Sequence, residues 1–210
     1  MGSDAPMRFG RKSVLRPASP VRTGDDDRAN MLEVIVRFER LPTTLKRLIR
    51  VVIETPRGSA AKIAYDPASQ VFEYSRPLPV GTLYPYDWGF IPSTRGEDGD
   101  PLDGLVIHMA ATAPGVVIKC DLLGCVTVEQ RDADGAVMRN DRFVLSPHKL
   151  DAPYQSVAED QVNRQLRAEI EHFFASVVLG TGKSVSFKRR QGTAEAWELI
   201  KQGQKAFRRS

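Results

Sequence analysis

Residues 97–103 read Glu97-Asp98-Gly99-Asp100-Pro101-Leu102-Asp103 and separate two groups of expected β-strands. Four of these seven residues are carboxylates, and the Gly and Pro among them disfavour a continuous helix or a central strand. Like charges this close repel one another unless a cation or a solvated surface relieves the repulsion. Hard divalent cations such as Mg²⁺ and Mn²⁺ take carboxylate and water oxygens and commonly bridge to phosphates. The stretch is therefore either a solvated acidic turn or part of a metal site.

Short strands are expected on both sides of this acidic stretch. Upstream, alternating or β-branched apolar runs predict strands at residues 31–39, 48–55, 61–65 and 70–74. The last two flank Asp66-Pro67-Ala68-Ser69, a sequence typical of a hairpin turn. Downstream, strands are expected at residues 105–109, 116–128 and 143–145, the middle one interrupted at Gly124.

The period of the apolar residues then changes from that of a strand to that of a helix. Apolar side chains recur at helical spacing over residues 156–178, and Thr193 can cap a final helix over residues 193–207. Several short strands followed by helices predict an α+β fold. The expected arrangement is a closed or nearly closed β-barrel with the helices packed outside it.

The chain has the length and composition of one globular domain with an appended leader. Residues 1–30 are rich in Arg, Ser, Gly, Pro and Asp and predict a disordered basic leader, followed by a single domain over residues 31–210. No apolar run reaches the length needed to span a bilayer, which predicts no membrane association. Cys120 and Cys125 lie in one apolar segment and do not form a disulfide framework, so a reducing cytoplasm is expected.

Charge is distributed unevenly along the chain. Residues 1–50 hold 11 Lys and Arg against 6 Asp and Glu, residues 183–210 hold 8 against 2, and residues 51–182 hold 11 against 18. A nucleic-acid-binding domain usually carries its basic residues on the folded surface that binds. Because the folded middle is acidic here, it is suited to cations, and the charge pattern argues against nucleic acid as the main partner.

Four further side chains near the acidic stretch suit an anionic substrate. Glu54 ends a predicted strand, Lys62 and Arg76 lie on the two arms of the hairpin, and Tyr84 lies just upstream of the acidic residues. Arg and Lys bind phosphate oxygens directly, while divalent metals neutralise the remaining charge. Phosphate or pyrophosphate is therefore the expected class of ligand.

These residues and their surroundings resemble the family I soluble inorganic pyrophosphatases. The motifs that carry the resemblance are Val51-Val52-Ile53-Glu54-Thr55-Pro56, Tyr84-Pro85-Tyr86-Asp87-Trp88-Gly89-Phe90-Ile91-Pro92, Asp98-Gly99-Asp100-Pro101-Leu102-Asp103, Pro147-His148-Lys149-Leu150 and Glu171-His172-Phe173-Phe174. The resemblance covers residues 48–175 and implies an OB-like β-barrel with flanking helices. It also implies pyrophosphate as substrate, Mg²⁺ or another divalent cation such as Mn²⁺ as cofactor, and a homo-oligomer, usually a hexamer in bacteria.

The resemblance also assigns roles to the acidic residues. Asp98 and Asp103 match metal ligands, and Asp103 matches the one that bridges two activating Mg²⁺ ions. Asp100 matches the general base that takes a proton from the attacking water. Glu54 matches a further acid of the metal site.

The same comparison places cationic and phenolic side chains around the phosphates. Lys62, Arg76 and Tyr84 match residues that contact phosphate. Arg142 matches a phosphate-binding Lys, whose charge it keeps but whose geometry it changes.

This chain departs from the family pattern on one side of the site. A second pair of metal-binding carboxylates corresponds to Asp132, placed across an insertion, and to Asn140, which keeps a carbonyl oxygen but lacks the charge. The other departures are Ala64 for a Glu, Trp88 for a Tyr, and Val177-Val178 for a Tyr-Lys pair.

Three hypotheses follow from this mixture of matches and departures. The first is a metal-dependent pyrophosphatase, with a reduced rate or an altered preference for metal or substrate. The second is a catalytically weak or inactive homologue that binds metal, phosphate compounds or a partner. The third is an OB-type nucleic-acid-binding protein that uses its basic ends.

Overall fold

The computed structural model describes residues 36–110, 112–131, 134–149, 159–178 and 181–209. The predicted leader and most of the strand predicted over residues 31–39 lie outside these ranges. In the part that is described, residues 36 and 37 are not in a strand, and a 3₁₀ turn, η2, follows at Phe38–Arg40. The side chain of Phe38 packs edge-on against Tyr65 and Phe72, with ring centroids 5.6 and 5.4 Å away. These contacts are tertiary, so the local alternation did not reveal them, and the strand prediction is wrong for these residues.

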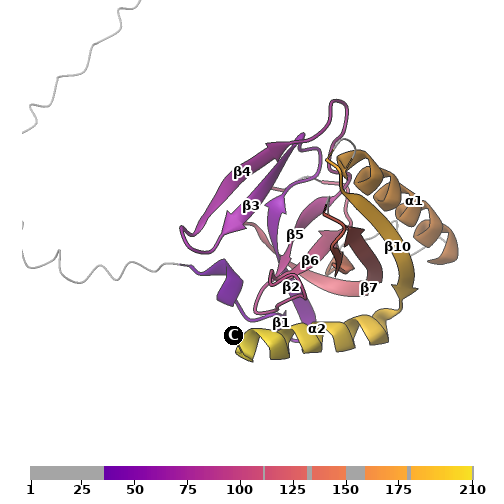
Figure 1. The fold of residues 1–210 in the computed structure, drawn as a ribbon. Helices are drawn as coiled ribbons and strands as arrows, with labels where there is room; N and C mark the ends of the chain where they lie inside the picture. Colours follow the sequence, from indigo (N-terminus) through magenta and orange to yellow (C-terminus); the bar gives the residue numbers. More distant parts are fainter. Residues whose placement is uncertain (1–35, 111, 132–133, 150–158, 179–180, 210) are drawn as a thin grey trace, which may run out of the picture. The chain divides into compact units, whose positions relative to one another are not determined.

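The fold is mainly β-sheet with two long helices (Figure 1). One eight-stranded sheet contains β1 (Thr44–Leu45), β2 (Leu48–Thr55), β5 (Asp87–Ile91), β6 (Leu102–Val106), β7 (Val117–Arg131), β8 (Val137–Arg139), β9 (Arg142–Pro147) and β10 (Ser184–Gln191). A separate hairpin contains β3 (Ala61–Asp66) and β4 (Val71–Pro77). The helices are α1 (Glu159–Val178) and α2 (Thr193–Arg209), which confirms both helix predictions to within a few residues.

Hydrogen-bonded neighbours in the large sheet follow one another around a ring. The order is β2, β5, β6, β9 and β7, and the first residues of β7 pair again with β2. All of these pairs are antiparallel except β6 with β9, which is parallel and sets Asp103 opposite Arg142. This single parallel pair brings two predicted site residues together from positions 39 apart in the sequence.

Strand β7 is longer and less interrupted than its sequence suggests. The predicted break at Gly124 is a bulge within one continuous 15-residue strand. Gly124 has φ +153°, and a Cβ there would lie 2.8 Å from the carbonyl oxygen of Gln191 on β10. Glycine therefore allows β10 to approach closely without ending the strand.

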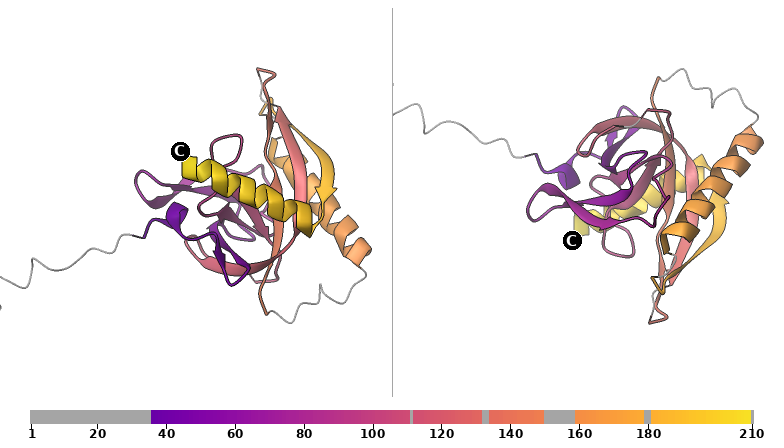
Figure 2. Two further views of the ribbon diagram at one scale, coloured as in Figure 1. Left: turned by 90° about the horizontal axis from the view of Figure 1, so that it is seen from below. Right: turned by 90° about the horizontal axis from the view of Figure 1, so that it is seen from above.

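Alternate side chains of the strands enter two apolar clusters. One cluster contains Val51, Phe143 and Leu145 and is covered by Ala196 and Ile200 of α2. The other contains residues of β5, β6, β7 and β9 together with the apolar side of α1; its members include Tyr84, Trp88, Leu105, Val144, Ile170, Phe173 and Val177. Figure 2 shows the two helices on different sides of the sheet. Arg142 has the same parity in β9 as Val144, so its side chain lies on the α1 side.

The local signals in the hairpin were sufficient to predict it. β3 and β4 pair around the turn, with Lys62 opposite Arg76 and a shift of register between Lys62 and Ile63. The carboxylate of Asp66 accepts hydrogen bonds from the backbone N–H groups of Ala68 and Ser69, each at 3.0 Å. This is the turn chemistry expected of an Asp at the start of such a loop.

No helix in the described ranges combines the length and apolar character that crossing a bilayer requires.

Candidate active site

The acidic stretch divides between a tight turn and the start of a strand. The backbone N–H of Gly96 donates to the carbonyl of Asp100 at 2.7 Å, and Asp98 Oδ1 accepts from the N–H of Asp100 at 3.1 Å. Arg95 Nε donates to the carbonyl of Gly99 at 2.9 Å. Asp103, in contrast, already belongs to β6, which begins three residues earlier than predicted. The turn therefore fixes its own backbone, and Asp103 is fixed independently by the sheet.

Three of the candidate carboxyl groups influence one another electrostatically. Burial is the main cause of a raised pKa at Asp98, and the neighbouring charge of Asp100 raises it further. Burial likewise raises the pKa of Glu54 to about 7, again with a contribution from Asp100. A divalent cation close to such carboxyl groups favours their ionised form and binds to their oxygens.

Glu54 is held at the end of β2 by the neighbouring hairpin. Its Oε1 accepts a hydrogen bond from the N–H of Tyr65 on β3 at 2.8 Å. The ammonium of Lys62 opposes the effect of burial on the Glu54 pKa but does not overcome it. Lys62 and Glu54 are therefore close enough for their charges to interact.

Tyr84 and Arg76 also approach one another. Tyr84 is buried against Phe173, with ring centroids 4.9 Å apart. Burial raises its pKa to about 12, while the charge of Arg76 acts in the opposite direction. The phenol thus keeps its proton at neutral pH and can donate a hydrogen bond to an anion.

Arg142 lies at the centre of the remaining predicted residues. Its Nη1 donates to Asp103 Oδ2 and also to Asn140 Oδ1. Asn140 was predicted as a metal ligand, and in this arrangement its oxygen instead accepts from the guanidinium. Asp132, the other member of that predicted pair, lies outside the described residues.

The residues fit a divalent cation in chemistry but do not form a closed cage. Within the described ranges, no group of three His, Cys, Asp or Glu side chains is arranged closely enough to hold a metal ion. The donors present nearby, Asp98, Asp100, Asp103 and Glu54, are all hard oxygen ligands of the kind that Mg²⁺ prefers. One oxygen of Asp103 is already paired with Arg142, which accounts in part for the open arrangement.

A cavity of about 210 Å³ adjoins the acidic turn on the side of α2. Its lining includes Arg95 and Asp98 from the turn, Asn140 and Asp141 from the segment before β9, and Gln202 from α2. Asp98 and Asn140 thus border a space large enough for water or a small ion, although α2 carried no predicted site residue.

Two lysines that follow the Val177-Val178 pair in the sequence have partners of their own. Lys188 lies on β10 and forms an ion pair with Glu129 at 3.0 Å, with both side chains partly exposed. Lys183 makes an interaction of its own near the start of the same strand. Val177 is buried in the aromatic cluster beside Tyr84 and Trp88, so it contributes an apolar wall in place of a phosphate ligand.

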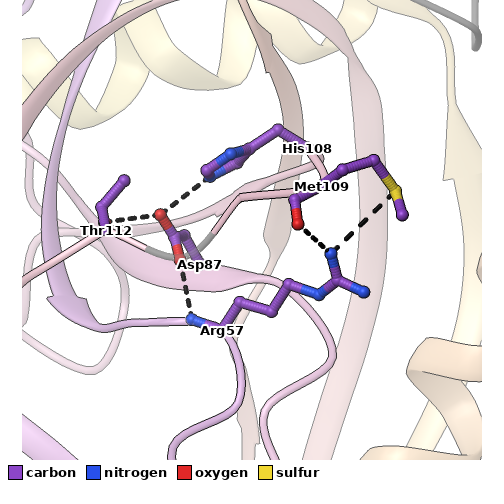
Figure 3. Close-up of polar contacts among 5 residues, drawn as sticks. All are labelled: Arg57, Asp87, His108, Met109 and Thr112. Carbon is purple, nitrogen blue, oxygen red and sulfur yellow. Dashed lines mark hydrogen bonds and ion pairs between the residues drawn. The ribbon is translucent and has the colours of Figure 1, made fainter.

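A buried polar network was not predicted from the sequence. Asp87 is fully buried at the start of β5, and its Oδ1 accepts from the backbone N–H of Arg57 at 2.7 Å. Its Oδ2 lies 2.8 Å from His108 Nε2 and accepts from Thr112 Oγ1 at 2.6 Å (Figure 3). The side chain of Arg57 in turn donates to the carbonyl of Met109. The sequence signal that could have predicted this network is an Asp inside an otherwise apolar strand, because a buried carboxyl group requires hydrogen-bond partners.

Replacement of Asp87 by asparagine is expected to lower the free energy of unfolding by about 2 kcal/mol, because one amide oxygen cannot accept from all three groups. Urea denaturation of the two proteins measures this difference. The matched control is Asp121→Asn, since Asp121 lies 2.9 Å from His148 Nδ1 but both side chains are exposed. Its expected effect is under about 1 kcal/mol. Equal losses for both variants would contradict a special role for the buried network.

Comparison with known proteins identifies the family of this chain. The family model described as inorganic pyrophosphatase matches residues 51–208. An inorganic pyrophosphatase of Aquifex pyrophilus is 39% identical over 158 residues, covering 74% of this chain and 86% of the relative. The corresponding protein of Thermus thermophilus is 40% identical over 127 residues, covering 60% of this chain and 70% of the relative.

Solved structures give the same result. The crystal structure of the Thermus thermophilus inorganic pyrophosphatase superposes with a TM-score of 0.73 at 30% identity, covering 82% of this chain and 99% of that one. The Helicobacter pylori inorganic pyrophosphatase superposes with a TM-score of 0.70 at 29% identity, covering 81% and 99%. The chain belongs to the inorganic pyrophosphatase family.

Proposed function

We propose that this protein hydrolyses inorganic pyrophosphate to two phosphate ions with the help of a divalent cation, generally Mg²⁺. The observation that carries this is the convergence of acidic and basic side chains from separate strands. The charge of Asp100 acts on both Asp98 and Glu54, and Arg142 is hydrogen-bonded to Asp103. Family members depend on divalent metal, generally Mg²⁺, which agrees with the oxygen-rich donor set.

Asp98 and Asp103 would hold the activating metal, with Glu54 as a further acid of that site and Asp132 and Asn140 as the second predicted pair. When bound, the metal would supply Lewis-acid polarisation of a phosphate oxygen and a lowered pKa for the attacking water. Asp100 is the general base that accepts the proton of this water. Its carboxylate is exposed, and Asp100 contributes to the turn through main-chain hydrogen bonds, so the turn does not depend on that carboxylate.

The basic side chains and the phenol bind and orient pyrophosphate. Lys62 and Arg76 project from neighbouring positions on the hairpin, and both influence acidic or phenolic groups of the site. Tyr84 donates a hydrogen bond from its hydroxyl group to a phosphate oxygen. Arg142 supplies a positive charge from the sheet side. Together these groups neutralise the charge of the leaving phosphate.

The wider organisation follows from the same assignment. We infer that the ring of paired strands is an OB-like closed barrel, that residues 31–210 form one catalytic domain after a basic leader, and that the chain assembles as a homo-oligomer, with a hexamer as the expected form. A reducing cytoplasmic location fits the two buried cysteines, Cys120 and Cys125, whose thiol pKa values are raised by burial.

The direct test is phosphate release from pyrophosphate in the presence of Mg²⁺, Mn²⁺, Co²⁺ or Zn²⁺ in turn. Release is expected with Mg²⁺ and is expected to stop when a chelator removes the metal, because the carboxylates alone cannot activate water. Restoration by added Mg²⁺ is the control for damage to the protein. Absence of release with all four metals would contradict the proposed function.

A further inference from the structure

Arg142 is placed by the fold between two side chains that could otherwise contribute to metal binding. The parallel pairing of β6 and β9 sets its backbone opposite Asp103, and Asn140 lies two residues earlier. One nitrogen, Nη1, donates to both Asp103 Oδ2 and Asn140 Oδ1. A cation approaching these two oxygens therefore meets a positive charge that is already bound to both.

The guanidinium is also enclosed by aromatic rings. Its Cζ lies 5.1 Å from the ring centre of Trp88 and 5.4 Å from that of Phe174. The residue is 6% exposed. Contacts of a desolvated guanidinium with aromatic faces are favourable. Two rings and two oxygen acceptors thus hold Arg142 in place, and it cannot swing into solvent as a long exposed side chain would.

The charge of Arg142 persists under these conditions. An arginine guanidinium is not deprotonated in proteins, so it carries its positive charge at neutral pH. Its Nε is buried and has no hydrogen-bond partner within the described part of the chain. Leaving a buried donor without a partner is costly.

We propose that Arg142 is a built-in cation that occupies the Asp103–Asn140 side of the site, so that this chain binds one divalent cation fewer than a site with a carboxylate at position 140 and an ammonium at position 142. The inference rests on the proposed function, because it concerns the same site. A lysine ammonium is a compact charge on a flexible stem and does not stack on aromatic rings as this guanidinium does. An arginine held between Trp88 and Phe174 stays paired with one oxygen of Asp103, so only the other oxygen of that carboxylate is left for a metal ion.

The number of metal ions bound tests this directly. Mn²⁺ bound per chain is measured by equilibrium dialysis and by the electron paramagnetic resonance signal of free Mn²⁺, without pyrophosphate. The double variant Asn140→Asp/Arg142→Lys is expected to bind about one more Mn²⁺ per chain than the wild type. Arg139→Lys is the matched control, since Arg139 donates from Nε and Nη2 to the carboxylate of Asp141. Its Mn²⁺ count should equal that of the wild type. An equal count for the double variant and the wild type would overturn the proposal.

A second variant covers the case in which the double variant does not fold. Asn140→Asp alone retains the guanidinium, which then pairs with two carboxylates, so no additional Mn²⁺ is expected. A gain of one Mn²⁺ in this single variant would overturn the proposal, because the guanidinium would not be what limits metal binding. Phosphate release by the wild-type preparation is measured in parallel. An inactive wild type with the expected Mn²⁺ counts contradicts the proposed function alone, and an active one with unchanged counts contradicts this inference alone.

Discussion

Replacement of Asp100 by asparagine is expected to lower the rate of phosphate release from pyrophosphate by about 10²- to 10⁴-fold, which is the usual contribution of a general base. The amide preserves the size of the side chain but cannot accept a proton. The fold of the turn should persist, because the main chain of Asp100 makes the hydrogen bonds to Gly96 and Asp98. The measurement is the steady-state rate at saturating Mg²⁺ and saturating pyrophosphate.

The matched control for this substitution is Asp121→Asn, an exposed carboxylate on β7 outside the site. Its rate should stay within about twofold of the wild type, in keeping with the small effects of exposed charges. Mn²⁺ binding by the Asp100→Asn variant separates loss of a base from loss of a metal ligand. A fall of less than tenfold with normal metal binding would mean that another group takes the proton.

Local chemistry explains which parts of this fold the sequence predicts well. The hairpin follows from Asp66 and its turn, and both helices follow from apolar spacing, since these signals are contained within a few residues. The ring of strands depends on pairings between distant segments, above all the parallel pair of β6 and β9. Nothing in either segment alone specifies that Asp103 will lie opposite Arg142. Asn140 was predicted as a metal ligand from its place in the family pattern, and its contact with the guanidinium was not foreseen because it depends on this pairing.

The role of Trp88 also depends on contacts between distant segments, which the sequence alone does not reveal. From the sequence, Trp88 is the loss of a tyrosine hydroxyl on the phosphate side. In the structure its ring faces the guanidinium of Arg142, and Phe174 of α1 faces the same group. Three residues that depart from the family pattern are therefore coupled, because Trp88 and Asn140 both contact Arg142. Their coupling becomes visible only when β5, β9 and α1 are packed together.

The raised pKa of Glu54 predicts an unusual dependence of stability on pH in the metal-free protein. Burial raises this pKa from 4.5 to about 7, so the folded state retains a proton that the unfolded state releases. The favourable contribution is fully present below about pH 4.5 and is lost as pH rises through about 7. The loss is up to about 3 kcal/mol, from the free energy that corresponds to a pKa difference of this size.

Urea denaturation of the wild type and of Glu54→Gln, with a chelator present, measures this effect. The glutamine stays neutral, so the difference in unfolding free energy between the two proteins should change by up to about 3 kcal/mol between about pH 4.5 and pH 8. Glu73→Gln, an exposed position on β4, is the matched control and should track the wild type at every pH. A constant difference between wild type and Glu54→Gln would contradict the assignment.

Saturating Mg²⁺ then tests whether Glu54 belongs to the metal site. A metal that binds the ionised carboxylate stabilises the folded state at the pH values where the metal-free protein loses stability, because binding to the folded state alone adds to its free energy of unfolding. The pH-dependent difference between wild type and Glu54→Gln should therefore shrink or reverse when Mg²⁺ is added. If the difference is the same with and without Mg²⁺, Glu54 lies near the site but does not bind the metal ion.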